Sequence, residues 1–122
     1  MKKLILLSLL LAFGISCNND DPIDLNDINI RIINSSSQTF KSVYVHSGNG
    51  VNTYVNIRPG QSSDYKSYTE AYRYGYIEVK TLTKEYKIQP FDYVGETVLK
   101  SGKYSYQLSI VENKLELTFS KD

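Results

Sequence analysis

The sequence predicts an all-β domain, an antiparallel β-sandwich of seven or eight short strands. From Ile28 onward, apolar and polar residues alternate with a period of two, the pattern of strands that bury one face. The segments between these runs are rich in Gly, Asn, Ser and Pro, which favour turns. Tyrosine is abundant, with 11 residues, and alanine is scarce, which favours strands over helices. A small β-barrel is the alternative architecture.

Eight segments carry the strand pattern. In the first, Ile28, Ile30 and Ile32 share one face, and a polar Asn-Ser-Ser-Ser run ends the strand. The best-marked pair is predicted to form a hairpin through Glu112 and Asn113. The segment 62–68 has the fewest apolar residues. The predicted strands cover residues 28–33, 40–46, 54–57, 62–68, 73–82, 86–89, 103–111 and 114–120.

A tyrosine corner is predicted at the start of the segment 103–111, and it favours an immunoglobulin-like sandwich over a barrel. In this device a tyrosine near the start of a strand donates its hydroxyl to backbone a few residues upstream. Tyr104 has the expected position after Gly102. Tyr106, two residues later, is then expected to point into the core, where antibody domains place a disulfide-bonded cysteine.

The N-terminus has the three parts of a secretory signal peptide, predicted to cover residues 1–16. Lys2 and Lys3 precede an apolar run of 12 residues, Leu4 to Ile15, and small residues follow. As a helix this run spans about 18 Å, which is too short for a bilayer core of about 30 Å. A permanent transmembrane helix is therefore the weaker interpretation.

Cys17 is the predicted site of lipid attachment, in the position of the lipidated cysteine that ends a bacterial lipobox. It is the only cysteine in the chain, so it has no intramolecular disulfide partner. Gly14 stands where the lipobox prefers leucine. The acidic run 18–21 resembles the surface-export signal of lipoproteins from Bacteroidota. We expect residues 17–27 to be a polar tether at the outer membrane, on its periplasmic or cell-surface face, and residues 28–122 to form the sandwich.

The charge of the chain argues against nucleic acid as a partner. Removal of Lys2 and Lys3 leaves 12 basic against 13 acidic residues, a net charge of about −1. The expected partners are the membrane, through the lipid on Cys17, and a protein or a glycan.

The residues for catalysis and for metal binding are sparse, so a non-catalytic protein without cofactors is predicted. His46 is the only histidine, and no Gly-x-Ser-x-Gly motif accompanies it. One histidine does not supply a zinc site. Carboxylate pairs such as Asp64 with Glu70, or Asp92 with Glu96, are expected by chance in a small chain with 13 acidic residues.

The candidate binding surface is formed by Tyr72, Tyr74 and Tyr76. Residues two apart on an extended strand share a face, and Ile77 and Val79 have the opposite parity, so the three rings are expected to lie outward. Tyrosines combine apolar area with a hydroxyl and suit sugar faces and protein interfaces. The alternative is ordinary packing between strands, and a bulge at Gly75 would bury some of the rings.

The chain resembles small uncharacterised lipoproteins of Bacteroidota that have a single β-sandwich domain. The resemblance rests on the Cys17 signal and on the stretches 71–77, 88–96 and 102–106. It implies export and a β-sandwich and says nothing about mechanism. Three functions stay open: a binding module that uses the tyrosine face, an accessory subunit that pairs through a sheet edge, and, least favoured, an enzyme.

Overall fold

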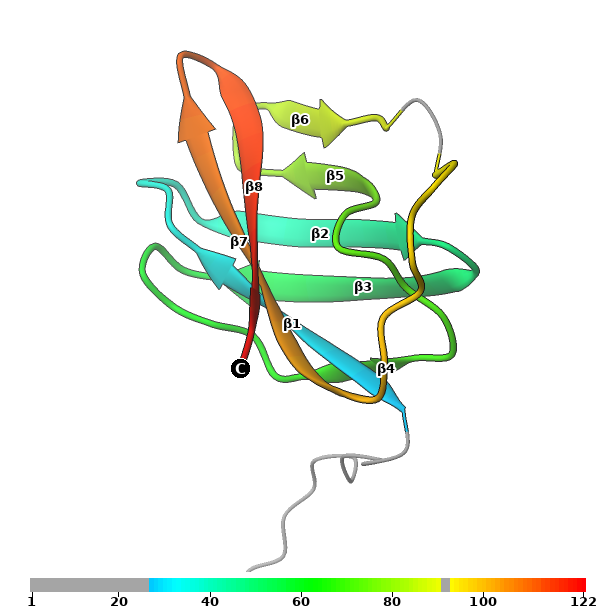
Figure 1. Cartoon of the computed structure of the whole chain (residues 1–122). Coiled ribbons are helices and arrows are strands. Elements are labelled where there is room, and N and C mark those ends of the chain that lie inside the picture. The colour runs from blue at the N-terminus through cyan, green and yellow to red at the C-terminus, as the bar shows by residue number, and fades with distance from the viewer. Residues whose placement is uncertain (1–26, 91–92) are drawn as a thin grey trace, which may run out of the picture.

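The computed structural model describes residues 27–90 and 93–122, which form a sandwich of two four-stranded sheets (Figure 1). The predicted signal peptide, Cys17 and the tether up to residue 26 lie outside the described residues. The described part is all-β, and none of its segments is a helix long and apolar enough to cross a membrane. Its strands are β1 (Ile28–Asn34), β2 (Phe40–Ser47), β3 (Gly50–Ile57), β4 (Lys66–Tyr68), β5 (Tyr76–Lys80), β6 (Glu85–Ile88), β7 (Gly102–Val111) and β8 (Lys114–Lys121).

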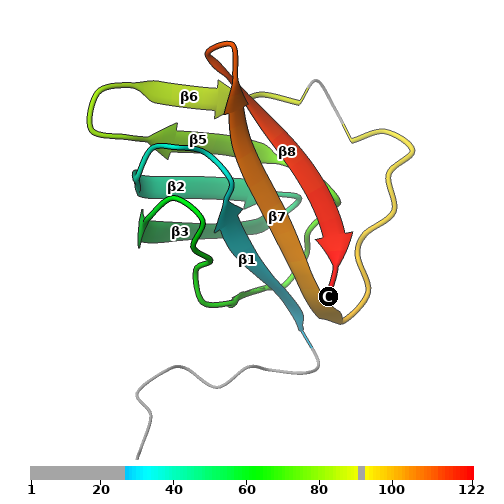
Figure 2. The same ribbon diagram turned by 90° about the vertical axis from the view of Figure 1, so that its left-hand side faces the viewer.

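The predicted sandwich is confirmed, and one of its two sheets is mixed. The first sheet has the order β4-β1-β7-β8 and the second has the order β3-β2-β5-β6. All pairs are antiparallel except β1 with β7, which run parallel from Ile28 beside Gly102 to Asn34 beside Leu108. Figure 2 shows the long strands of the first sheet crossing the second sheet obliquely.

The core lies between the sheets and follows the predicted alternation. Ile28, Ile30 and Ile32 of β1 are buried, as are Val43 and Val45 of β2. Burying a side chain of this size contributes roughly 1.5–3 kcal/mol, so each of these alternating positions stabilises the fold. The other buried apolar side chains are Phe40, Tyr54, Ile57, Tyr68, Ala71, Ile77, Val79, Tyr86, Tyr104, Tyr106, Leu108 and Leu115.

The predicted tyrosine corner is present at the start of β7. The Tyr104 hydroxyl donates to the carbonyl oxygen of Lys100 at 2.8 Å. Tyr106 is fully buried, as expected for the residue two positions later. The corner ties the loop before β7 to the strand itself.

Several strands begin elsewhere than predicted. β3 begins at Gly50, four residues before the expected start, because a two-residue turn at Gly48 and Asn49 joins it to β2. The segment 62–68 keeps only three strand residues, those of β4. β5 starts at Tyr76, so the predicted strand 73–82 is shorter at both ends.

Candidate functional site

The three predicted tyrosines do not share one strand face. Tyr76 is the first residue of β5, whereas Tyr72 and Tyr74 lie in the irregular segment before it. All three side chains are half-buried. The expectation of a continuous extended ladder was therefore wrong for Tyr72 and Tyr74.

Ser47, at the end of β2, holds the segment of Tyr72 and Tyr74 out of the sheet. Its buried hydroxyl accepts a hydrogen bond from the Tyr72 N–H at 2.8 Å and donates to the Tyr74 carbonyl at 2.6 Å. The Tyr106 hydroxyl reaches the same place from β7 and donates to the Tyr72 carbonyl. These bonds satisfy backbone groups that a strand partner would otherwise satisfy.

Gly75 allows this segment to lie directly on β2. A Cβ atom at this position would stand 2.7 Å from the carbonyl oxygen of His46 and 2.8 Å from the Cβ of Ser47. Contacts this short exclude every other residue type without movement of the backbone. The glycine that was considered as a bulge is instead a point of close approach between two segments.

Tyr93, which follows β6 and was not predicted, completes a stack of three rings. Its ring centroid lies 4.7 Å from that of Tyr72 and 5.3 Å from that of Tyr74, with interplanar angles of 22° and 16°. Such offset stacks contribute about 0.5–1.5 kcal/mol per pair beyond buried area. Partial burial raises the pKa of the Tyr93 hydroxyl. We call Tyr72, Tyr74 and Tyr93 the tyrosine stack.

Tyr76 lies beside the stack on the outer face of the second sheet. It is paired across strands with His46, and its ring meets that of Tyr44 edge-on at 6.1 Å. Two residues further along β5, Glu78 forms an ion pair of 3.7 Å with Lys87, its neighbour on β6. This outer face therefore presents aromatic rings next to polar and charged groups.

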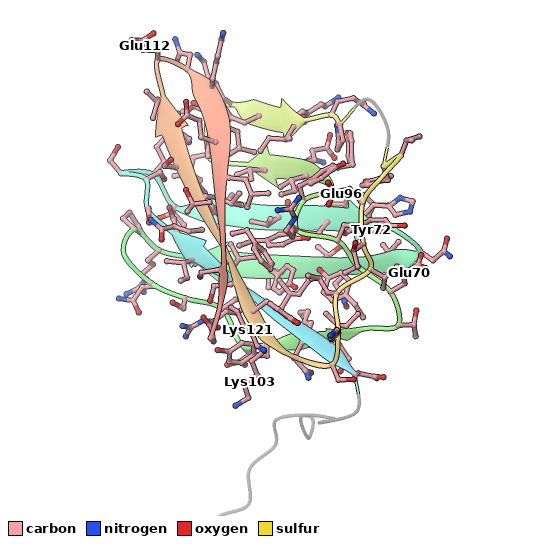
Figure 3. All side chains as sticks on the ribbon, viewed as in Figure 1. Glu70, Tyr72, Glu96, Lys103, Glu112 and Lys121 are labelled. Carbon is pink, nitrogen blue, oxygen red and sulfur yellow. The ribbon has the colours of Figure 1, made fainter. Side chains whose placement is uncertain are left out.

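Arg73 connects the two loops that carry the tyrosine stack. Its guanidinium lies 3.1 Å from a carboxylate oxygen of Glu96, and the Leu99 N–H donates to the Ala71 carbonyl at 2.9 Å. Figure 3 shows Glu70, Tyr72 and Glu96 on the same side of the molecule. A shallow pocket of about 320 Å³ lies beneath the second loop, between Arg73, Leu99 and Lys121.

Potential metal ligands do not cluster in the part of the chain that the structure describes. In residues 27–90 and 93–122, no three His, Cys, Asp or Glu side chains gather in a group that could hold an ion. His46 is exposed and lines neither the pocket near Arg73 nor the groove beside β3 described below. The tyrosine stack presents three half-buried rings at the surface.

Comparison with known proteins supports the fold alone. No family model and no curated protein matches the chain. A protein from Eubacterium rectale whose structure was solved by NMR is similar, with a TM-score of 0.59, 14% identity and coverage of 80% of this chain and 91% of that one. The C-terminal domain of AlgF from P. aeruginosa gives a TM-score of 0.47 and 12% identity, covering 80% and 99%.

Proposed function

We propose that the chain is a lipoprotein of the outer membrane, anchored through Cys17, whose β-sandwich is a non-catalytic interaction module. The N-terminal pattern supports export and lipidation. Partners are a protein or a glycan of the cell envelope, contacted through the tyrosine stack and the neighbouring Tyr76.

The observation that carries this proposal is how the tyrosine stack is built. Its three rings are half-exposed, although the chain has 11 tyrosines and does not need these three to fill its core. The backbone of Tyr72 and Tyr74 is fixed by the hydroxyls of Ser47 and Tyr106. Rings held in advance lose little conformational freedom when they bind, which favours recognition.

The chemistry of the surface suits flat ligands that are partly apolar. Ring faces accept the C–H face of a sugar or an aliphatic side chain, and the hydroxyls bond to polar groups at the rim. Arg73 and Glu96 already neutralise one another. We therefore expect binding that depends little on salt.

Two variants of the domain 22–122 separate this proposal from plain packing. Tyr74→Ala with Tyr93→Ala removes two rings of the stack, whereas Tyr65→Ala removes a half-buried tyrosine of another region and is the matched control. Binding on a glycan array, or to a purified envelope fraction, should be lost in the first variant and kept in the second. Equal binding by both would contradict the tyrosine stack as the site.

The anchor is tested separately in the full chain. Cys17→Ser should abolish incorporation of labelled palmitate. A Cys17→Ser chain that still incorporates the label would contradict lipid attachment at Cys17.

A further inference from the structure

The strongest feature outside the tyrosine stack is the free edge of β3. β3 ends the second sheet, and Val51 and Val55 are 49% and 61% exposed. Edge strands normally carry charges or proline, which prevent pairing with another chain. β3 has eight residues and none of these, whereas β4, β6 and β8 all carry charged side chains: Lys66; Glu85 and Lys87; Lys114, Glu116 and Lys121.

The register of β3 shows which backbone groups are free. A two-residue turn makes Ser47 and Gly50 a hydrogen-bonded pair, and bonded and non-bonded pairs alternate along the strand from there. The backbone groups of Val51, Thr53 and Val55 therefore point away from β2. In the described part of the chain, none of these three residues has a backbone hydrogen bond outside the sheet.

The sequence of this edge is complementary to itself. An antiparallel two-fold centred on Thr53 places Thr53 opposite its own copy and Val51 opposite Val55. All three outward-facing backbone positions are then used, and the exposed valines form β-branched pairs, which favour sheet pairing. Asn56, with φ +54°, limits regular pairing to the residues before it.

A groove beside β3 is positioned to bind the end of a second copy, and its charge favours this contact. It has a volume of about 590 Å³ and is lined by Thr53–Arg58, Gln61–Asp64 and Lys66. Its charged side chains are Arg58, Lys66 and Asp64, so it is positive on balance. In an antiparallel pair, the turn at Gly48 and Asn49 of the second copy lies toward the end of β3, which Arg58 follows.

Gly48 is next to a carboxylate. Glu70 accepts a hydrogen bond from the Asn49 N–H at 3.0 Å, and its Oε1 stands 2.9 Å from where a Cβ of Gly48 would be. The turn that enters the groove thus brings a negative charge to Arg58 and Lys66. Because the pair has two-fold symmetry, this contact forms twice.

From the free edge, the self-complementary register and the opposite charges, we propose that two copies of this chain associate through antiparallel β3 strands, forming one continuous eight-stranded sheet. This goes beyond the tyrosine-mediated binding proposed above and does not depend on it, because no residue of the tyrosine stack lies on β3.

Disulfide trapping tests the register. The core residues all lie between Ile28 and Phe119, so the fragment 22–122 contains the whole core and omits Cys17. Thr53→Cys then supplies the sole thiol. Opposed Cα atoms of a hydrogen-bonded antiparallel pair are about 5.5 Å apart, which a disulfide spans. Thr118→Cys, exposed on β8, is the matched control. Cross-linking should be about tenfold or more faster for Thr53→Cys, because a formed pair makes the reaction intramolecular.

Two charge variants test the same surface by sedimentation velocity. Val55→Lys and Arg58→Glu should each raise the dissociation constant about tenfold or more. Their melting temperatures at low concentration should stay unchanged. A parent that is monomeric at every concentration, with equal cross-linking of the two cysteine variants, would overturn the proposal. A dimer that neither charge variant weakens would overturn it as well.

Discussion

The hydroxyl oxygens of Tyr54 and Tyr68 lie 2.8 Å apart in the interior, although the two residues belong to different sheets. Tyr54 donates to the Ile30 carbonyl at 2.8 Å, so Tyr68 donates to Tyr54. Burial raises the pKa of both hydroxyls, and it does the same for Tyr106. The contact between the sheets therefore requires neutral phenols.

Alkaline pH should unfold the domain. Because these hydroxyls have a pKa above the unfolded value of about 10, their contribution is complete below that pH and is lost as the pH rises above it. We expect the free energy of unfolding in urea to be flat up to about pH 9 and to fall above pH 10. The phenolate absorbance of the buried tyrosines should appear together with the loss of strand circular dichroism.

Tyr54→Phe should destabilise the domain at neutral pH by about 1–3 kcal/mol, because the Ile30 carbonyl and the Tyr68 hydroxyl lose their partner. Its stability should also fall less steeply above pH 10, since one titrating group is gone. Tyr76→Phe on the outer face is the control. A steep alkaline loss unchanged by Tyr54→Phe would assign the effect to other groups.

Asp122 should stabilise the domain above about pH 4. Partial burial alone would raise its pKa, but hydrogen bonds from Tyr65 and Ser105 and the charges of Arg31 and Lys103 outweigh this and lower it. A lowered pKa gives stability that is present above the unfolded value and lost as the pH falls.

Asp122→Asn should therefore cost about 0.5–1 kcal/mol at pH 7, a value kept small by solvent screening. The difference from the parent should vanish near pH 2, which urea denaturation at several pH values would show. A constant difference across that range would mean that the carboxylate charge contributes nothing.

Ser47→Ala should loosen the tyrosine stack as well as the fold. It removes the acceptor of the Tyr72 N–H and the donor to the Tyr74 carbonyl. We expect a loss of about 1–3 kcal/mol and a weaker near-ultraviolet circular dichroism signal from tyrosine. Ser42→Ala, on the outer face of the same strand, should change neither.

Gly75→Ala should lower the free energy of unfolding by more than about 1 kcal/mol and by several kcal/mol at most. The reason is that a Cβ would press on the backbone of His46 and Ser47. Thermal unfolding measures this loss. Ala71→Gly, a change of similar size four residues earlier, should cost about 1 kcal/mol from lost burial and added freedom. A Gly75→Ala variant as stable as the parent would contradict the close approach.

Period-two alternation was sufficient to predict the sandwich and most of its core. Ile28, Ile30 and Ile32 are buried as expected, and the tyrosine corner at Tyr104 was predicted from local sequence. Both features depend on residues that are close together in the chain, so a single sequence contains the signal.

The candidate site was predicted only in part, because its determinants are distant in sequence. Tyr72 and Tyr74 leave the strand through bonds to Ser47, 25 and 27 residues away. No sequence pattern near Tyr93 predicted that its ring stacks on those of Tyr72 and Tyr74. Alternation alone cannot distinguish a strand from a segment whose backbone is bound by a side chain of another element.

The parallel pairing of β1 with β7 has a consequence for how the chain is made. Residues that meet in this pair, such as Arg31 and Ser105, are 74 positions apart. A chain that emerges N-terminus first can pair β1 with β4 early, but the edge of β1 that faces β7 stays unpaired until nearly the whole domain has appeared. Contacts of such long range slow folding. If the protein is exported, that edge of an apolar strand stays exposed during this interval, and we expect a periplasmic chaperone to bind there.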